Sequence, residues 1–570
     1  MKRDLQALSR ETFDLGVIGG GIHGAATARE AALRGLKVAL VEARDFASGT
    51  SSRSSKLIHG GLRYLEQFDF RLVRESRCER RLLVRLAPHL AYPVPFVLPI
   101  YRGDTYFPLK VRAGLTIYDL LGNLGPEDRH RMLSADEALQ LVPALRGEGL
   151  RGAALYHDSE TDDARLTLEN VLGAAEHGAV VANYTEVRAL ALSPRGARDG
   201  AIVTAEAEDR LTGRRYEISA RFWVNAAGPW VDQVRALVPG FDGSKTLRLT
   251  KGTHLIIPPI AGPYALLAAI LGEDRVFLTV PWGNCTLLGT TDTDFAGDPA
   301  SVQPDAAETR YLLNALNRIL CQPVGAEQVL GGFAGLRALV IEPGRSPSAT
   351  TREYRFHRDP WAQNFVSICG GKLTTARALA EKLVDQIAAE LGANPPNPLG
   401  NHPSRRVPLP GGTAGPFEAF VKSASESAAR DFHLPLPVAE RVVRTYGSRW
   451  RLVLEPLRAE KQLAEPLPGT PTVLAAEVEF AIRHEMALTL EDFLLRRSGL
   501  NWAAGTPPCA ESVPAVAEIF ARRLGWDAER KQAALDSFAR CAAGIRDSAC
   551  RPKALADGSG FASCSPAPNT

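Results

Sequence analysis

The sequence lacks paired cysteines. Its eight cysteines are scattered over 570 residues, and no two of them form a C-x-x-C motif. Structural zinc sites and disulfide frameworks both depend on cysteines at matched spacings. We therefore expect neither a metal centre nor a disulfide-stabilised secreted fold, and the composition favours a reducing compartment.

Long uninterrupted apolar runs are also missing. Residues 253–272 carry no charged side chain and would be long enough to span a bilayer, but Pro258, Pro259 and Pro263 interrupt them. Because proline breaks a helix interior, strands and a turn are the better interpretation. The first twelve residues are polar. We therefore expect no signal peptide and no transmembrane helix.

An excess of one charge is absent as well. The 67 basic residues nearly balance the 64 acidic ones, which leaves a net charge of +3. This balance gives no reason to expect a nucleic-acid partner. The chain is too long for a single hydrophobic core, so two or three domains are expected.

The first fifty residues contain a complete βαβ pattern. An apolar run over residues 13–18 precedes Gly19, Gly21 and Gly24, which fit G-x-G-x-x-G. An alanine-rich helical stretch and a second apolar run then end at Glu42. In such units the glycines allow a tight turn, a close approach of pyrophosphate and close helix packing, and the acid binds a ribose. The spacing predicts a dinucleotide site at a helix N-terminus.

A hydroxyl-rich loop follows this unit. Residues 47–56 are too polar for a core element, and they lead into the sequence LIHGGLRY at residues 57–64. Hydroxyls and backbone N–H groups suit phosphates and a polar ring edge. Such a loop favours FAD, which is longer and more enclosed than NAD. Contacts with the cofactor are expected from Thr50, Ser51, Ser55, Lys56, Leu57 and His59.

Together, VIGGGIHGAATA at residues 17–28 and TSSRSSKLIHGGLRYLE at residues 50–66 resemble motifs of the FAD-dependent, aerobic, membrane-associated glycerol-3-phosphate dehydrogenases. The resemblance extends over nearly the whole chain. It implies FAD as cofactor and an α/β fold, with a Rossmann-like FAD-binding fold in two parts, an antiparallel substrate-binding sheet and an all-helical C-terminal domain. Arg53 stands where a small residue is expected, and His23 occupies a variable position. Either could alter the potential or affinity of the flavin.

Two later segments return to the cofactor. Residues 180–225 are rich in strand patterns and run into an Ala-Ala-Gly sequence, and a strand at 365–368 leads into GGKLTT at 370–375. A glycine turn that feeds a helix N-terminus suits an anion or the carbonyl of a reduced flavin. Contacts with FAD are expected here from Val187, Ala227, Gly228, Gly371, Leu373 and Thr374.

Composition divides the chain into parts. Alternating apolar patterns predict an antiparallel sheet in the second part, proline-rich sequence predicts a linker, and helical periodicity follows it. The predicted parts are an FAD-binding domain over 1–243, a substrate-binding domain over 244–360, a return segment of the FAD-binding domain over 361–393, a linker over 394–415, a helical C-terminal domain over 416–545 and a disordered tail over 546–570.

Residues 101–121 are the expected membrane contact. Arg102, Lys110 and Arg112 are interspersed there with aromatic and aliphatic residues. Such a mixture suits an element that lies in a membrane interface, and the resembled family is monotopic. A buried helix with a basic end is the alternative interpretation. We expect peripheral attachment on the cytoplasmic side of the membrane.

Cationic residues in the family motifs predict the substrate site. The resemblance implies sn-glycerol 3-phosphate as the substrate, and a planar guanidinium can bind two oxygens of its phosphate. The residues expected to hold the phosphate are Arg63, Tyr64, Arg352 and Lys372. Arg337 is expected to lie nearer the reacting carbon.

Oxidation of a secondary alcohol also needs a group that removes the hydroxyl proton. An imidazole suits this task near neutral pH. His254 begins a strand of the presumed substrate sheet and matches a family histidine, while His59 is the alternative because it lies closer to the flavin loop. The expected catalytic residues are His254, Arg337 and Lys372.

The sequence thus predicts a flavoenzyme that oxidises glycerol 3-phosphate to dihydroxyacetone phosphate and passes the electrons to a membrane quinone. A homodimer is possible. An oxygen-using glycerol-3-phosphate oxidase and a related amine or amino-acid oxidase are alternative enzymes, although an amino-acid site needs fewer phosphate-binding cations. A catalytically inactive FAD-binding scaffold is the alternative of a different class.

Overall fold

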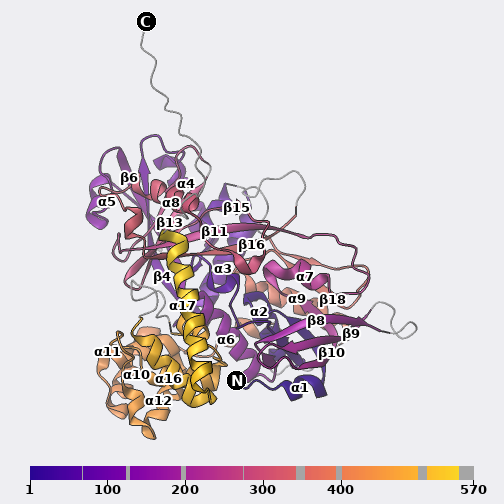
Figure 1. Ribbon diagram of the computed structural model, residues 1–570. Coiled ribbons are helices and arrows are strands. Elements are labelled where there is room, and N and C mark those ends of the chain that lie inside the picture. The colour runs from indigo at the N-terminus through magenta and orange to yellow at the C-terminus, as the bar shows by residue number, and fades with distance from the viewer. Residues whose placement is uncertain are drawn as a thin grey trace, which may run out of the picture.

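The computed structural model describes residues 1–66, 68–122, 129–193, 201–273, 275–341, 353–392, 399, 401–498 and 510–550, with only the backbone of Arg63 and of 547–550. Two β-sheets, the helices packed on them and a group of C-terminal helices make up this part of the chain (Figure 1). Among the described helices, none combines the length and apolar character needed to cross a bilayer.

The first sheet is a parallel core extended by antiparallel strands. β1 (Thr12–Ile18) pairs in parallel with both β2 (Val38–Val41) and β10 (Arg215–Asn225), which confirms the predicted βαβ unit. Helix α2 (Ile22–Leu33) packs between α6 (Asp163–Glu176) and α9 (Ala376–Glu390). The other strands are β7 (Val180–Ala182), β8 (Thr185–Leu192), β9 (Ile202–Asp209), β17 (Arg355–His357) and β18 (Phe365–Cys369).

The second sheet has ten strands and is mostly antiparallel. Its order is β15-β11-β14-β13-β12-β4-β6-β3, with β16 paired to β11 and β5 to β6. The strands are β3 (Leu57–Ile58), β4 (Ala91–Tyr101), β5 (Arg131–Leu133), β6 (Leu150–Thr161), β11 (Leu247–Ile257), β12 (Ala265–Ala269), β13 (Val276–Trp282), β14 (Cys285–Gly289), β15 (Thr293–Asp294) and β16 (Gly331–Val340).

The second sheet is not confined to residues 244–360, as the sequence had predicted. Strands β3, β4, β5 and β6 come from residues 57–161, and β17 of the first sheet falls inside the predicted span. Within the second sheet, β4 pairs in parallel with β12 and thereby joins the strands from residues 57–161 to those from residues 247–340. The second sheet therefore takes strands from both sides of the predicted boundary at residue 244.

Helices cover both faces of the second sheet. Alternate residues of β4 point to opposite sides: Phe96 packs with α3 (Phe70–Leu86) and α4 (Pro108–Gly122), whereas Val97 packs with α5 (Ala135–Leu141) and α8 (Ala306–Asn317). Helix α3 begins at Phe70, because the side chain of Asp69 caps it by accepting a hydrogen bond from the Leu72 N–H. A short 3₁₀ turn over Leu62–Leu65 precedes it.

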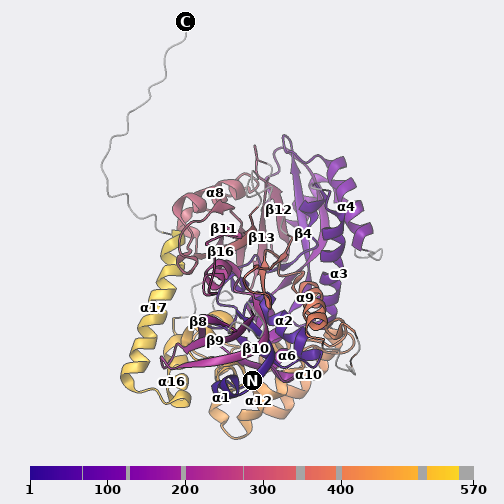
Figure 2. The same ribbon diagram turned by 90° about the vertical axis from the view of Figure 1, so that its right-hand side faces the viewer.

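The C-terminal part of the chain is helical, as the sequence predicts. They are α10 (Phe417–Phe432), α11 (Leu436–Tyr446), α12 (Trp450–Leu454), α13 (Ala475–Glu485), α14 (Leu490–Arg496), α16 (Ser512–Leu524) and α17 (Ala528–Cys550). α17 runs from this group along the side of the molecule to β16 (Figures 1 and 2). The tail was predicted to be disordered from residue 546, but the helix continues to Cys550; Ile545, just before that point, contacts Gly331. Residues 551–570 lie outside the described part.

Candidate functional site

A cavity of about 660 Å³ opens where β1, β2 and β10 end. In parallel sheets, the crevice outside the carboxyl ends of the strands is the usual ligand site. Eleven of the residues predicted to contact a dinucleotide line it: Gly19, Gly21, Glu42, Thr50, Ser51, His59, Val187, Ala227, Gly228, Gly371 and Leu373.

The glycines of the first turn have distinct roles. Gly19 adopts a positive φ of 110°, which a side chain would strain. A Cβ on Gly24 would come 1.9 Å from the carbonyl oxygen of Gly19, so only glycine lets α2 approach the turn. Gly24 lines no cavity, and its role here is packing. Gly21 is the N-cap of α2, whose first N–H groups face the cavity side and suit an anion.

Glu42 ends β2 and holds the first turn in place. Its carboxylate accepts hydrogen bonds from the backbone N–H groups of Gly20 at 2.7 Å and Arg44 at 2.9 Å. Burial raises the pKa of Glu42, although both N–H groups oppose that effect. The carboxylate also lines the cavity, where it can accept a hydrogen bond from a ribose hydroxyl.

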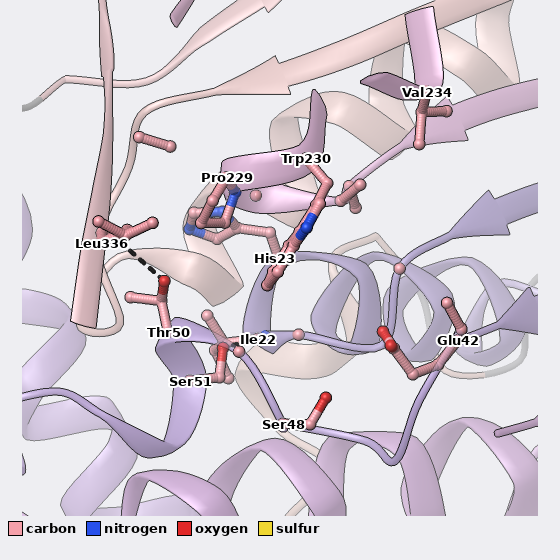
Figure 3. Close-up of a pocket in the computed structure, with 18 of the residues that line it drawn as sticks. Ile22, His23, Glu42, Ser48, Thr50, Ser51, Pro229, Trp230, Val234 and Leu336 are labelled. Atoms are coloured by element: carbon pink, nitrogen blue, oxygen red, sulfur yellow. Dashed lines mark hydrogen bonds between the residues drawn. The ribbon is translucent and has the colours of Figure 1, made fainter. Parts of the chain in front are cut away.

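The hydroxyl-rich loop closes one side of this cavity. The Ser51 hydroxyl accepts a hydrogen bond from the Ile22 N–H at 2.9 Å, and Thr50 donates to the Leu336 carbonyl at 2.7 Å. Figure 3 shows this part of the pocket, with the Thr50–Leu336 hydrogen bond on one side and Glu42 on the other. His23 and Trp230 also line the pocket in this view. The loop therefore joins the nucleotide turn to β16 of the second sheet.

A second cavity of about 290 Å³ adjoins the first on the side of the second sheet. Eight residues line both cavities, so they share a wall: Thr50, Ser54, His59, Tyr64, Leu336, Arg337, Lys372 and Leu373. Of the predicted residues, Ser55, Leu57, His254 and Thr374 line the second cavity alone. A small molecule bound there would lie directly beside a ring held in the first cavity.

Two cationic side chains face the shared wall. The Lys372 ammonium lies 3.6 Å from the centre of the Tyr64 ring. Arg337 donates hydrogen bonds to the Thr291 carbonyl and to the Asp292 carboxylate, each at 3.1 Å. The side chain of Arg63 and the whole of Arg352 fall outside the described residues. The structure therefore brings together three of the five residues predicted to bind substrate.

His254 is buried against the second cavity. Its ring stacks on Phe333, and its Nε2 lies 2.8 Å from the Ser55 hydroxyl. Burial, together with the nearby Arg337 and Lys56 cations, lowers the pKa of His254 to about 3. The imidazole is therefore neutral near pH 7 in the ligand-free protein and can accept a proton.

Lys56 was predicted to contact the cofactor, but its side chain is placed elsewhere. It lines neither cavity, and its ammonium lies 2.6 Å from the buried carboxylate of Asp163 at the start of α6. Asp163 also accepts hydrogen bonds from the backbone and hydroxyl of Ser54. The Lys56 side chain therefore holds the loop that carries the cavity residues.

Many residues of the cavity walls were not assigned from the sequence, and three of them bear on the chemistry. Trp230 lines the first cavity, while Arg275 and Asp158 line the second. Trp230 follows the Ala-Ala-Gly turn closely, a position that could have pointed to it. Asp158 accepts a hydrogen bond from the Gly60 N–H at 3.0 Å, a contact that the pairing of β3 with β6 brings about.

Known protein families and proteins match most of this chain. Residues 14–386 match the family model "FAD dependent oxidoreductase", and residues 403–531 match "C-terminal domain of alpha-glycerophosphate oxidase". The aerobic glycerol-3-phosphate dehydrogenase of Bacillus subtilis is 34% identical over 540 residues, which are 93% of this chain and 94% of that protein. The glycerol-3-phosphate dehydrogenase of Mycobacterium leprae is 38% identical over 91% of this chain and 86% of its own.

Solved structures give the same answer for the fold. The glycerol-3-phosphate dehydrogenase of Bacillus halodurans, complexed with FAD, superposes with a TM-score of 0.75 at 30% identity, covering 95% of this chain and 96% of its own. The L-alpha-glycerophosphate oxidase of Mycoplasma pneumoniae, at 18% identity and a TM-score of 0.52, covers 69% of this chain and 98% of its own. The second likeness concerns the fold alone.

Proposed function

Because the chain belongs to the family of FAD-dependent glycerol-3-phosphate dehydrogenases, we propose that it oxidises sn-glycerol 3-phosphate to dihydroxyacetone phosphate. FAD is the cofactor of this oxidoreductase. The observation that carries the proposal is the second cavity, where cationic side chains and a buried histidine adjoin the cofactor cavity.

The residues of the first cavity fit FAD. The N-terminus of α2 would hold the pyrophosphate, and Glu42 would bind the ribose. The glycine turn before α9 would lie against the flavin ring, because Gly371 has a φ of 93° and no side chain there. When bound, FAD supplies the acceptor for a hydride and its electron pair.

The charge of the second cavity supports a phosphate-bearing substrate. We propose that Lys372 and Tyr64, with Arg63 and Arg352, hold the phosphate dianion. Arg337 would lie nearer the reacting carbon, since it lines both cavities. An amine or amino acid would give these cations less to bind.

We propose His254 as the base that takes the hydroxyl proton. Its pKa of about 3 is low because burial and the Arg337 and Lys56 cations disfavour the imidazolium. A bound phosphate dianion adds negative charge and raises that pKa, so the base gains strength when the substrate arrives. His59, which lines both cavities, is the alternative base.

We further propose a membrane quinone as the electron acceptor and peripheral contact with lipid through α4. The inner side of α4 is buried through Val111, Leu115 and Tyr118. Its outer side still carries exposed apolar residues, with Leu109 71% and Leu120 73% exposed. An apolar outer face on a helix that is already packed needs a second apolar partner, and a bilayer interface would provide one.

Molecular oxygen is the second candidate for the acceptor. The match of residues 403–531 to a domain named for an alpha-glycerophosphate oxidase supports it. Hydrogen peroxide measured per substrate oxidised separates the two acceptors. A yield near one would favour the oxidase, whereas a low yield with rapid reduction of a soluble quinone would favour the dehydrogenase.

Anaerobic titration tests the oxidation itself. Addition of glycerol 3-phosphate to the purified flavoprotein should bleach the flavin absorption, and dihydroxyacetone phosphate should form in equal amount. A flavin that remains oxidised would contradict the proposed oxidation of glycerol 3-phosphate and would favour an inactive FAD-binding scaffold.

A further inference from the structure

The imidazole of His254 is enclosed on both faces. Its ring lies 5.0 Å from the Phe333 ring, nearly parallel to it, and only 3% of the residue is exposed. On the other side it packs on Gly289, where a Cβ would come 2.3 Å from the imidazole Cδ2. Such a ring cannot easily turn toward a substrate in the cavity.

Only one polar contact connects this ring to its surroundings among the described residues. Nε2 lies 2.8 Å from the Ser55 hydroxyl, whereas Nδ1 is buried without a hydrogen-bond partner. Ser55 is half-buried and lines the second cavity. The Ser55 hydroxyl therefore stands at the cavity wall, bonded to the buried base.

We propose that Ser55 relays the hydroxyl proton of the substrate to His254. The inference rests on the proposed oxidation of glycerol 3-phosphate. The carbinol O–H bond breaks and its proton passes to Ser55 Oγ, while the Ser55 hydroxyl proton passes to Nε2 of His254. At the same time the carbinol C–H bond breaks, its hydride leaves to the flavin with the electron pair, and the C=O bond forms. The substrate is oxidised by two electrons and the flavin is reduced by two.

The loop holds Ser55 in the position that a relay needs. The hydroxyl of the preceding Ser54 donates a hydrogen bond to the Asp163 carboxylate at 2.7 Å. The following Lys56 forms the buried ion pair with the same carboxylate. The residues on both sides of Ser55 are thus bonded to Asp163 of α6. A hydroxyl fixed in this way is prepared for proton transfer, because little reorganisation is needed when the substrate arrives.

A double-mutant cycle on flavin reduction tests the relay. The variants are Ser55→Ala, His254→Ala and both together, with Ser55→Thr as a variant that keeps the hydroxyl. Ser52→Ala is the matched control, since Ser52 belongs to the same loop but lines neither cavity. For each variant, anaerobic stopped-flow gives the limiting reduction rate and the dissociation constant for glycerol 3-phosphate, and the flavin content reports folding.

A relay predicts a specific pattern. Ser55→Ala should slow reduction by about 10²-fold or more with the dissociation constant changed less than about threefold. The double variant should be no slower than His254→Ala, and Ser55→Thr should recover most of the rate. A Ser55→Ala rate within about threefold of wild type would overturn the relay, as would losses that multiply in the double variant. If glycerol 3-phosphate does not reduce the flavin of the wild-type protein, both the proposed function and the relay are wrong.

Discussion

At the scale of single residues, burial lowers the pKa of two histidines that line the cavities. Burial lowers the pKa of His23 to about 4, although a contact with the Lys372 backbone opposes it, and the pKa of His254 falls to about 3. Both rings line the cavities in their neutral form. Only His254 combines this neutrality with a hydroxyl partner at the substrate side.

Replacement of His254 should affect the chemical step more than binding. His254→Ala should lower the rate of anaerobic flavin reduction by about 10²- to 10⁴-fold, because a positioned base contributes on that order. The dissociation constant for glycerol 3-phosphate should change far less. An unchanged reduction rate would remove His254 from the mechanism and favour His59.

His23 should make stability depend on pH. Its folded pKa of about 4 lies below the unfolded value of 6.5, so acid protonates the unfolded chain first and stability falls as pH drops below 6.5. His23→Asn removes this group. Between pH 7 and pH 5 the variant should lose less stability than wild type, by about 2 kcal/mol. Thermal midpoints that fall equally in both proteins over this range would contradict the assignment.

Residue types could be predicted from the sequence more easily than their contacts. The glycines and Glu42 follow from a short local motif, so they were found. The ion pair of Lys56 with Asp163 joins residues more than a hundred positions apart, and no local pattern reports it. Asp158 was missed for a similar reason, because it lies 98 positions from Gly60 along the chain and contacts it through the pairing of β3 with β6.

At the scale of elements, α4 is a helix with two different apolar sides. The buried side continues the core of the second sheet, while Leu109 and Leu120 remain exposed near Lys110 and Arg112. The Lys110 ammonium also lies 3.0 Å from Glu66, which partly neutralises it. The apolar side chains are therefore a sharper target than the cations for testing membrane contact.

A double substitution on α4 should release the protein from lipid. The variant with Leu109→Glu and Leu120→Glu should bind sedimented vesicles that contain anionic lipid at least about tenfold more weakly, because each change removes an apolar side chain that the lipid would cover and adds charge repulsion. Leu436→Glu, on an exposed apolar residue of α11, is the control and should bind like wild type. Equal binding by all three proteins would exclude α4 as the contact.

The sequence predicted most elements but not how the second sheet is assembled. Helices such as α10 and α14 have regular periodicity, and both lie inside the helical domain predicted over 416–545. Strand pairing between residues 57–161 and 247–340 depends on tertiary contacts, which a local pattern does not contain. Helix α17 continues past residue 546, where a disordered tail was predicted, and it packs on β16, a tertiary contact that a local pattern does not contain.

At the scale of the whole molecule, buried ion pairs join the helical region to the nucleotide fold. Asp45, just after β2, is bonded to Arg496 at 2.6 Å and Arg497 at 2.7 Å. Burial alone would raise the pKa of Asp45, but these two arginines lower it to about 2. Arg165 of α6 likewise pairs with Glu485 at the end of α13.

Removal of one partner of the buried Asp45–Arg497 ion pair should destabilise the whole chain. Arg497→Met leaves Asp45 buried with one cation fewer, and it should lower the free energy of unfolding by about 3 kcal/mol or more. The control is Arg430→Met, where the side chain is 71% exposed and should change stability by no more than about 0.5 kcal/mol. If chemical denaturation gives both variants the same stability, the buried pair does not join the two regions.

Selectivity between glycerol 3-phosphate and glycerol tests the central claim most directly, because only the first carries the phosphate that the cations would hold. The measurement is the second-order rate of anaerobic flavin reduction by each alcohol. The account predicts a ratio above about 10³ for the wild-type protein, since glycerol lacks the phosphate that the half-buried Lys372 and Arg337 side chains would bind. The ratio should fall steeply in Lys372→Met. A wild-type ratio near one, or reduction by an amino acid in place of glycerol 3-phosphate, would contradict the account.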